Sequence, residues 1–118
     1  MTEIAAGHWL DTLPVGGTHP VRLVGVINVS PESFYAGSVA TAAAAITAQA
    51  ETMTRQGADM LDVGAMSTAP YLTTAIDAAE EIRRLELAIP AVRRGSPLPI
   101  SVDTIRAEAA AAALAAGA

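Results

Sequence analysis

The feature that most constrains the fold of this chain is an alternation, repeated three times, between a short apolar run and a longer stretch with helical periodicity. The apolar runs cover residues 21–29, 60–64 and 100–103. The first is rich in β-branched residues and apolar at almost every position, which is typical of a strand buried on both faces in a parallel sheet. We therefore predict three strands at these positions.

A helix is predicted after each strand. From residue 38 onward, apolar side chains recur at three- and four-residue steps, and Gly57 stands where a left-handed C-terminal cap is expected. The second helix has a similar stripe and is preceded by Thr74 and Asp77, which are spaced to cap it. The third is an alanine-rich helix over residues 106–116. Three glutamates are assigned to the solvated outer face of the second helix, namely Glu80, Glu81 and Glu86.

The resulting order, β-α-β-α-β-α with short connections, indicates an α/β fold with a parallel sheet. Two architectures compete, the doubly wound sheet and the (β/α)8 TIM barrel. Neither GxxxxGKS/T nor GxGxxG follows the first strand, so the usual phosphate-binding reason for choosing the doubly wound sheet is missing. A barrel typically needs about 250 residues, and the chain has 118. We therefore expect the N-terminal three βα units of a barrel, in a fragment or truncated product.

The same pattern divides the chain into two parts. Residues 1–20 are poorly patterned and form a separate N-terminal segment, in which Trp9 and Leu10 can pair with residues near Val21 as a small hairpin. Residues 21–118 carry the alternating elements and form the partial barrel domain.

Composition and charge exclude several classes of protein, beginning with disordered chains, because 52% of the residues are hydrophobic. The formal net charge is −5 and the seven basic residues are scattered, so no nucleic-acid partner is expected. The absence of cysteine excludes disulfides, zinc–thiolate sites and thiol nucleophiles. The start lacks the pattern of a signal peptide, and the apolar runs are too short or interrupted to cross a bilayer. We therefore expect a cytoplasmic protein with no membrane partner.

Polar side chains stand at or just beyond the end of every predicted strand. Asn28 ends the first, Asp62 lies near the end of the second with Ser67 and Thr68 beyond it, and Asp103 ends the third. Ligands bind at the carboxyl ends of the strands in both architectures, so these residues are the candidate site. Such a rim suits a polar heterocycle with an anionic group held through a divalent cation. Asn28 can offer a neutral oxygen to Mg²⁺, Thr68 can donate to phosphate oxygens, and Asp103 can accept from ring N–H and amino groups.

Each of these residues also has a purely structural interpretation. Asn28 can anchor a loop, Thr68 can be a turn residue, and Asp103 can cap the third helix. For Asp62, which lies within its strand, an internal hydrogen bond of the barrel is the favoured interpretation, although it is kept among the candidate substrate contacts. Spacing alone leaves these alternatives open.

Three segments resemble, in order, the signatures of the dihydropteroate synthase family. Residues 25–34, Gly-Val-Ile-Asn-Val-Ser-Pro-Glu-Ser-Phe, resemble the first signature. Residues 57–64, followed by Ser-Thr-Ala-Pro at 67–70, resemble the second, and residues 99–104, Pro-Ile-Ser-Val-Asp-Thr, resemble the third. The resemblance covers residues from about 22 to 118, and three signatures in the right order are far more specific than any single motif.

This resemblance implies a pterin-binding (β/α)8 barrel and a transferase, which joins a dihydropterin-methyl diphosphate to a p-aminobenzoate-type arylamine and releases diphosphate with the help of Mg²⁺. It implies that Asn28 helps to hold the metal and the diphosphate, that Thr68 contacts the diphosphate, and that Asp103 hydrogen-bonds the pterin. Ser67 and Asp62 are further candidate substrate contacts. No nucleophilic side chain is required, because catalysis is mainly leaving-group stabilisation and positioning of the amine. We expect a homodimeric complete enzyme and an inactive isolated chain, since the family's other site residues come from later strands.

The chain departs from the family's pattern at three places. Ser30 and Glu32 replace the Thr and Asp of the first signature, residues 35–37 differ after the Phe, and Ala69 stands where the second signature has arginine. Alanine does not replace the forked donors of arginine. The pattern is similar to the branch associated with tetrahydromethanopterin synthesis, whose arylamine carries a ribosyl phosphate, so that acceptor is a further hypothesis.

Two rival functions are kept. A pterin-binding domain of a methyltransferase shares the barrel and the aspartate at its rim. A barrel that lacks the arginine can also have lost catalysis and serve as a pterin-binding or assembly subunit. Residues 28–34 and 67–70 favour the synthase over the methyltransferase.

Overall fold

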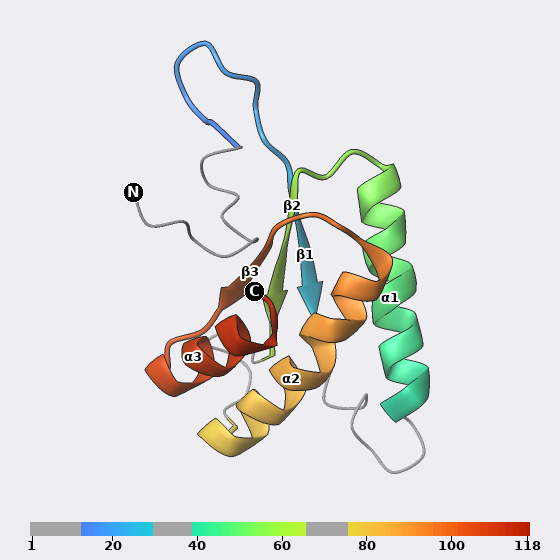
Figure 1. Cartoon of the computed structure of the whole chain (residues 1–118), viewed down its shortest axis with the longest axis vertical. Coiled ribbons are helices and arrows are strands. Elements are labelled where there is room, and N and C mark those ends of the chain that lie inside the picture. Colours follow the sequence, from blue (N-terminus) through green and yellow to red (C-terminus); the bar gives the residue numbers. More distant parts are fainter. Residues whose placement is uncertain (1–12, 30–38, 66–75) are drawn as a thin grey trace, which may run out of the picture.

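The computed structural model describes residues 13–29, 39–65 and 76–118. Its elements, shown in Figure 1, are β1 (Val24–Asn28), α1 (Val39–Arg55), β2 (Met60–Gly64), α2 (Ala78–Gly95), β3 (Ile100–Asp103) and α3 (Ala107–Ala116). The second and third strands begin and end where the sequence predicts. The predicted alternation of strands and helices is therefore confirmed.

The first strand begins at Val24, three residues later than the apolar run, because the backbone N–H of Leu23, the residue before it, is bound by the Asp59 side chain. The N–H of Leu23 donates to a carboxylate oxygen of Asp59 at 2.8 Å. Arg22 lies 3.8 Å from the same carboxylate and adds charge pairing there. These contacts tie the entry of β1 to the entry of β2, at the end of the sheet away from the candidate site.

The three strands form one parallel sheet in the order β1-β2-β3. Spatial order that follows chain order is the arrangement of successive strands in a barrel. A doubly wound sheet instead reverses its order at a switch point. The arrangement therefore agrees with the predicted N-terminal three βα units of a (β/α)8 barrel.

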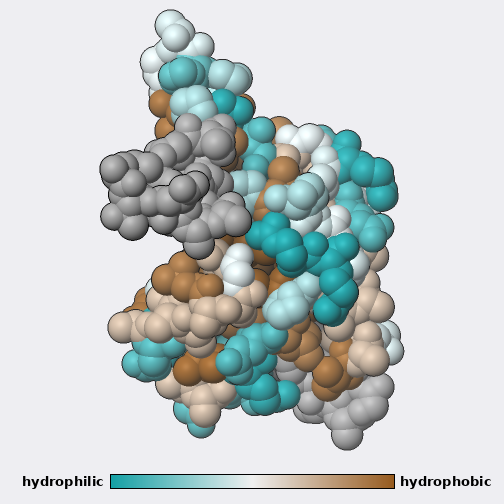
Figure 2. Space-filling model, viewed as in Figure 1, coloured by the Kyte–Doolittle hydropathy of each residue, from teal (hydrophilic) through white to brown (hydrophobic). Residues whose placement is uncertain are grey.

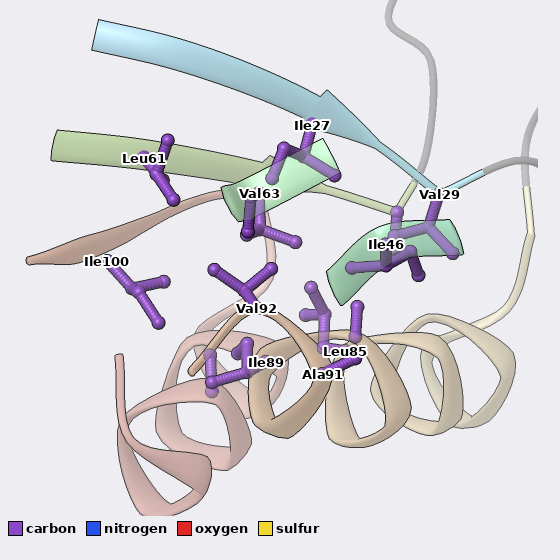
Figure 3. Close-up of a cluster of buried hydrophobic side chains, with 14 of the residues drawn as sticks. Ile27, Val29, Ile46, Leu61, Val63, Leu85, Ile89, Ala91, Val92 and Ile100 are labelled. Atoms are coloured by element: carbon purple, nitrogen blue, oxygen red, sulfur yellow. The ribbon is translucent and has the colours of Figure 1, made fainter. Parts of the chain in front are cut away.

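The three helices lie on one face of the sheet, and the core lies between them and the strands (Figure 1). Ile27, Leu61 and Val63 are fully buried on that face. Figure 3 shows them in one cluster with Ile89 and Val92 of α2, which are fully buried as well. Burying one such aliphatic side chain contributes about 1.5–3 kcal/mol, so this layer stabilises the fold.

The opposite face of the sheet is open among the residues that the structure describes. Val24 and Val26 of β1 are 48% and 52% exposed, respectively. Successive strand residues point to opposite faces, so these valines alternate with the buried Ile27 and with half-buried Gly25. The helix side differs from this open face. Figure 2 shows hydrophilic and hydrophobic residues interspersed over its surface.

The ends of the helices follow the predicted capping pattern. A carboxylate oxygen of Asp77 accepts from the backbone N–H of Glu80 at 2.8 Å, at the start of α2. Gly57 after α1 has φ +103° and Gly117 after α3 has φ +120°, the left-handed region that glycine tolerates. The other cap predicted for α2, Thr74, lies outside the described residues. No helix in the described part of the chain combines the length and the apolar character needed to cross a membrane.

The predicted N-terminal hairpin is not tested. Its residues Trp9 and Leu10 lie outside the described part of the chain. Within the described part, Gly16 and Gly17 form a turn in which the backbone N–H of His19 donates to the carbonyl of Gly16 at 3.0 Å. The assignment of residues 1–20 to a separate segment therefore stays a prediction.

Candidate functional site

The carboxyl ends of the three strands bring Asn28, Gly64 and Asp103 into one row. Asn28 pairs with Gly64 and Gly64 pairs with Asp103 in the register of the sheet. Paired residues of neighbouring parallel strands point to the same face, and neighbouring strands lie about 4.8 Å apart. The amide and the carboxylate therefore stand two strands apart, on the side of the sheet that the helices leave open. We call these three residues the strand-end row.

Gly64 leaves a gap in the middle of the strand-end row. A Cβ atom placed on Gly64 would lie 3.4 Å from the side-chain oxygen of Asn28, so the amide already extends beside this glycine. Any side chain at this position would occupy the space between the amide and the carboxylate of Asp103. The row is therefore a small polar cradle with an open centre.

The carboxylate of Asp103 is exposed and makes no hydrogen bond or ion pair with another residue that the structure describes. The capping interpretation of this residue is wrong, because the N-cap of α3 is Arg106, three residues later, and Asp103 accepts no hydrogen bond from the start of that helix. A carboxylate at the end of a strand, without a structural partner among the described residues, is available to a ligand.

Asp62 lies one row before the strand-end row, on the same face of the sheet. It pairs with Val26 on one side and with Ser101 on the other. The hydroxyl of Ser101 donates to one carboxylate oxygen of Asp62 at 2.6 Å. The predicted internal hydrogen bond is therefore present, and one oxygen of this carboxylate is engaged within the sheet.

Ser67 and Thr68 lie outside the described residues, so their predicted contacts stay predictions. The described residues on either side of that segment are both held through their backbone carbonyls. Arg84 donates to the carbonyl of Ala65 at 3.2 Å, and Arg106 donates to the carbonyl of Ile76 at 2.6 Å. Two arginines thus fix the points where the chain leaves β2 and where it enters α2.

A buried ionic cluster at the start of α2 was missed by the sequence interpretation. Glu81 was assigned to the outer face of its helix, and this is wrong, because its side chain is fully buried. Its carboxylate accepts from the hydroxyl of Thr104 at 2.6 Å and from Arg106 at 2.9 Å. The spacing holds a signal, since Glu81 stands four residues before the buried Leu85 and eight before Ile89, on the buried stripe of the helix.

The neighbouring Glu80 is partly exposed and is paired with two arginines. Arg83 donates to both of its carboxylate oxygens, at 2.9 and 2.7 Å, and Arg84 donates to one at 3.1 Å. Hydrogen bonding from Arg83, opposed by partial burial and aided by Arg84, lowers the pKa of Glu80 from its ordinary value. Glu80 and Arg84 stand four residues apart on the helix, a spacing that brings their side chains together.

The residues of the strand-end row can serve a hard cation only together with a ligand. No group of three or more His, Asp or Glu side chains that could hold a metal is found in the described ranges. Mg²⁺ is usually bound in proteins through one or two oxygen ligands, waters and substrate phosphates. The exposed amide oxygen of Asn28 fits that mode, and a metal cage made by the protein alone is not formed by the described residues.

The fold defines a barrel-type domain, and the strand-end row is its candidate small-molecule site, at the carboxyl ends of the strands. The chain belongs to the pterin binding enzyme family, because residues 24–118 match the sequence pattern of that family.

Two relatives illustrate the match. The dihydropteroate synthase of Synechocystis sp. is 39% identical over 111 residues, which cover 90% of this chain and 38% of the relative. A probable bifunctional folylpolyglutamate synthase/dihydropteroate synthase of Halobacterium salinarum is 40% identical over 98 residues, which cover 81% of this chain and 12% of the relative. The resemblance seen in the sequence is confirmed at the level of the family, and the chain spans well under half the length of these relatives.

Two solved structures agree with this assignment. The Xanthomonas albilineans dihydropteroate synthase with 4-aminobenzoic acid matches with a TM-score of 0.69 and 40% identity, over 82% of this chain and 36% of that one. The Anaplasma phagocytophilum enzyme with bound 6-hydroxymethylpterin-monophosphate matches with a TM-score of 0.68 and 36% identity, over 81% of this chain and 37% of that one. The described units therefore have the fold of the corresponding part of those enzymes.

Proposed function

We propose that the complete protein containing this chain is a transferase that joins a dihydropterin-methyl diphosphate to a p-aminobenzoate-type arylamine and releases diphosphate. The observation that carries the proposal is the strand-end row, an exposed amide and an unpartnered exposed carboxylate separated by Gly64, in a member of the pterin binding enzyme family. The ligands named for the two bacterial structures, 4-aminobenzoic acid and a pterin monophosphate, support this pair of substrates.

The reaction asks the protein for binding and electrostatics rather than for a nucleophile. The C–O bond between the pterin methylene and diphosphate breaks, the C–N bond to the arylamine forms, and the amine loses a proton. Asp103 accepts hydrogen bonds from the ring N–H and amino groups of the pterin and so orients the methylene toward the amine. Holding the two reactants in line supplies much of the rate enhancement in such a reaction.

Asn28 would offer its amide oxygen to Mg²⁺ bound with the diphosphate. When bound there, the ion supplies positive charge to the leaving group. The exposed amide of Asn28, beside the open position at Gly64, supports this role. Thr68 and Ser67 donate to diphosphate oxygens from the segment that follows β2. The carboxylate oxygen of Asp62 that Ser101 does not bind contacts the pterin, two residues before Gly64 on β2.

The pattern with Ala69 in place of arginine is similar to the branch associated with tetrahydromethanopterin synthesis, so a second acceptor for the same reaction is an arylamine that carries a ribosyl phosphate. Loss of a forked donor alters how an anionic acceptor is held. Turnover with p-aminobenzoate as fast as with the ribosylated amine would count against that acceptor. A methyltransferase domain and a non-catalytic subunit, the other interpretations, require pterin binding without release of diphosphate.

Two wider properties belong to the same proposal. We expect the complete enzyme to be a homodimer, which light scattering tests directly, and to work in the cytoplasm. The lack of cysteine in this chain is in keeping with a reducing compartment.

Calorimetric titration of the complete protein with 6-hydroxymethylpterin monophosphate tests the proposal. Asp103→Asn is expected to weaken binding at least tenfold, since a buried ligand N–H loses a charged acceptor. Glu108→Gln, an equivalent change at an exposed carboxylate five residues later, is the matched control and leaves Kd unchanged. The diphosphate form of the pterin is expected to bind more tightly when Mg²⁺ is added. Binding that is indifferent to Asp103 would overturn the proposed site.

A further inference from the structure

Glu81 is a carboxylate for which the proposed reaction has no direct use, yet it is fully buried. A buried carboxylate is costly unless it is paired and hydrogen-bonded. Both of its oxygens are satisfied, one by the hydroxyl of Thr104 at 2.6 Å and the other by Arg106 at 2.9 Å. Its two partners stand on the connection from β3 to α3, directly after Asp103.

The connection after β3 is held as a unit around this carboxylate. The hydroxyl of Thr104 also accepts from the backbone N–H of Arg106 at 3.1 Å. The second terminal nitrogen of Arg106 donates to the carbonyl of Ile76, just before α2, at 2.6 Å. Glu81 therefore ties the residues that follow Asp103 to the first turns of α2.

The hydrogen bonds of Thr104 and Arg106 with Glu81 bear on the direction of the Asp103 side chain. Asp103 is the last residue of a four-residue strand, which pairs with β2 on one side in the described sheet. Its own carboxylate has no partner among the described residues, so its backbone must set its position. That backbone is fixed at Asp103 itself by its pairing with Gly64, and after it by the contacts of Thr104 and Arg106 with Glu81.

We propose that Glu81 is a positioning residue, which aims the Asp103 carboxylate at the pterin by holding Thr104 and Arg106. The inference rests on the proposed function, because it assigns Glu81 a part in the pterin affinity of Asp103. Groups that orient a metal-binding side chain typically change affinity or activity about 10- to 100-fold when they are removed, and we expect an effect of this order for a side chain that binds the pterin.

Four variants of the complete protein, titrated with 6-hydroxymethylpterin monophosphate, test this role. Thr104→Val removes the hydroxyl while keeping the shape of the side chain, and Thr104→Ser keeps the hydroxyl. Glu81→Gln removes the charge, and Glu86→Gln makes the same change at an exposed position of the same helix. We expect Thr104→Val and Glu81→Gln to raise Kd about tenfold, and Thr104→Ser and Glu86→Gln to bind as the wild type does.

A double-variant cycle separates positioning from general support of the fold. If Thr104 and Glu81 act through Asp103, Thr104→Val has no further effect on Kd in the Asp103→Asn background. Groups that act independently give additive losses instead. The Thr104 variants decide the matter if Glu81→Gln fails to fold.

The possible failures can be told apart. A wild-type protein that binds no pterin overturns the proposed function, and the positioning role with it. A wild-type protein that binds pterin, together with a Thr104→Val variant that binds equally well, overturns the positioning role alone. Additive losses with Asp103→Asn overturn it as well.

Discussion

The two faces of the sheet differ sharply, although alternate residues of the same strands build them. Ile27 is fully buried under the helices, whereas its neighbours Val26 and Asn28 are exposed on the other face. Because side chains alternate along a strand, a shift of one residue in register would exchange the core with the site. Stability and binding are therefore encoded in interleaved positions, so substitutions can be directed at one without the other.

The largest difference between the faces is expected in stability. Leu85 of α2 is fully buried against the covered face, and Leu85→Ala should lower the free energy of unfolding by about 2–5 kcal/mol. Val26 is 52% exposed on the open face of this chain, and Val26→Ala should change the free energy of unfolding of the isolated 118-residue chain by no more than about 0.5 kcal/mol. Urea unfolding of the two variants measures both. Similar losses would mean that the open face is packed in solution.

Filling the strand-end row should affect binding more than folding. Gly64→Ala places a methyl group against the side-chain oxygen of Asn28, in the centre of the proposed pterin site. We expect Kd for 6-hydroxymethylpterin monophosphate to rise about tenfold, or about 1.4 kcal/mol, while the urea midpoint moves little. A large loss of stability with unchanged affinity would assign Gly64 to the scaffold instead.

The cap of α2 is expected to act on the scaffold alone. Asp77→Ala removes the acceptor for the Glu80 N–H and should cost about 1 kcal/mol of stability. Asp77→Asn keeps an acceptor and serves as the matched control. Thermal melts of the two variants measure the effect, and a pterin affinity that falls with Asp77→Ala would show that the separation between scaffold and site is incomplete.

The smallest effect is expected from the surface pairing of Glu80. Its pKa is lowered in the folded protein, chiefly by hydrogen bonds from Arg83, so its stabilisation is present above the unfolded pKa and is lost as pH falls through the folded pKa. Because the pair is partly exposed, Glu80→Gln should cost only a few tenths of a kcal/mol at pH 7. The difference should shrink as the pH falls below the unfolded pKa of about 4.3 and vanish once Glu80 is protonated in the folded protein. Stability curves that stay parallel across this range would contradict the pairing.

Much of the fold follows from local patterns in the sequence. The strands at residues 60–64 and 100–103 and the cap at Asp77 are predicted with their observed positions, because each depends on neighbours within a few residues. The convergence of Asn28 and Asp103 on one edge is also predictable, since parallel strands present their carboxyl ends together.

What the sequence does not predict depends on contacts between distant elements. The hydrogen bond between Ser101 and Asp62 joins residues 39 positions apart in the sequence, and it forms only in the observed register of β2 and β3. Glu81 was placed outside because glutamate is rarely fully buried without a partner. Its partner Arg106 lies 25 residues away, so the pair is visible only once α2 and α3 are packed.

Amide chemical shifts of the complete protein, titrated with 6-hydroxymethylpterin monophosphate, show directly whether the pterin binds at the strand-end row. We expect the largest changes at Asn28, Gly64 and Asp103, and small changes along the outer surfaces of α1 and α2. Changes concentrated on those helices, with the three strand ends unaffected, would contradict this expectation.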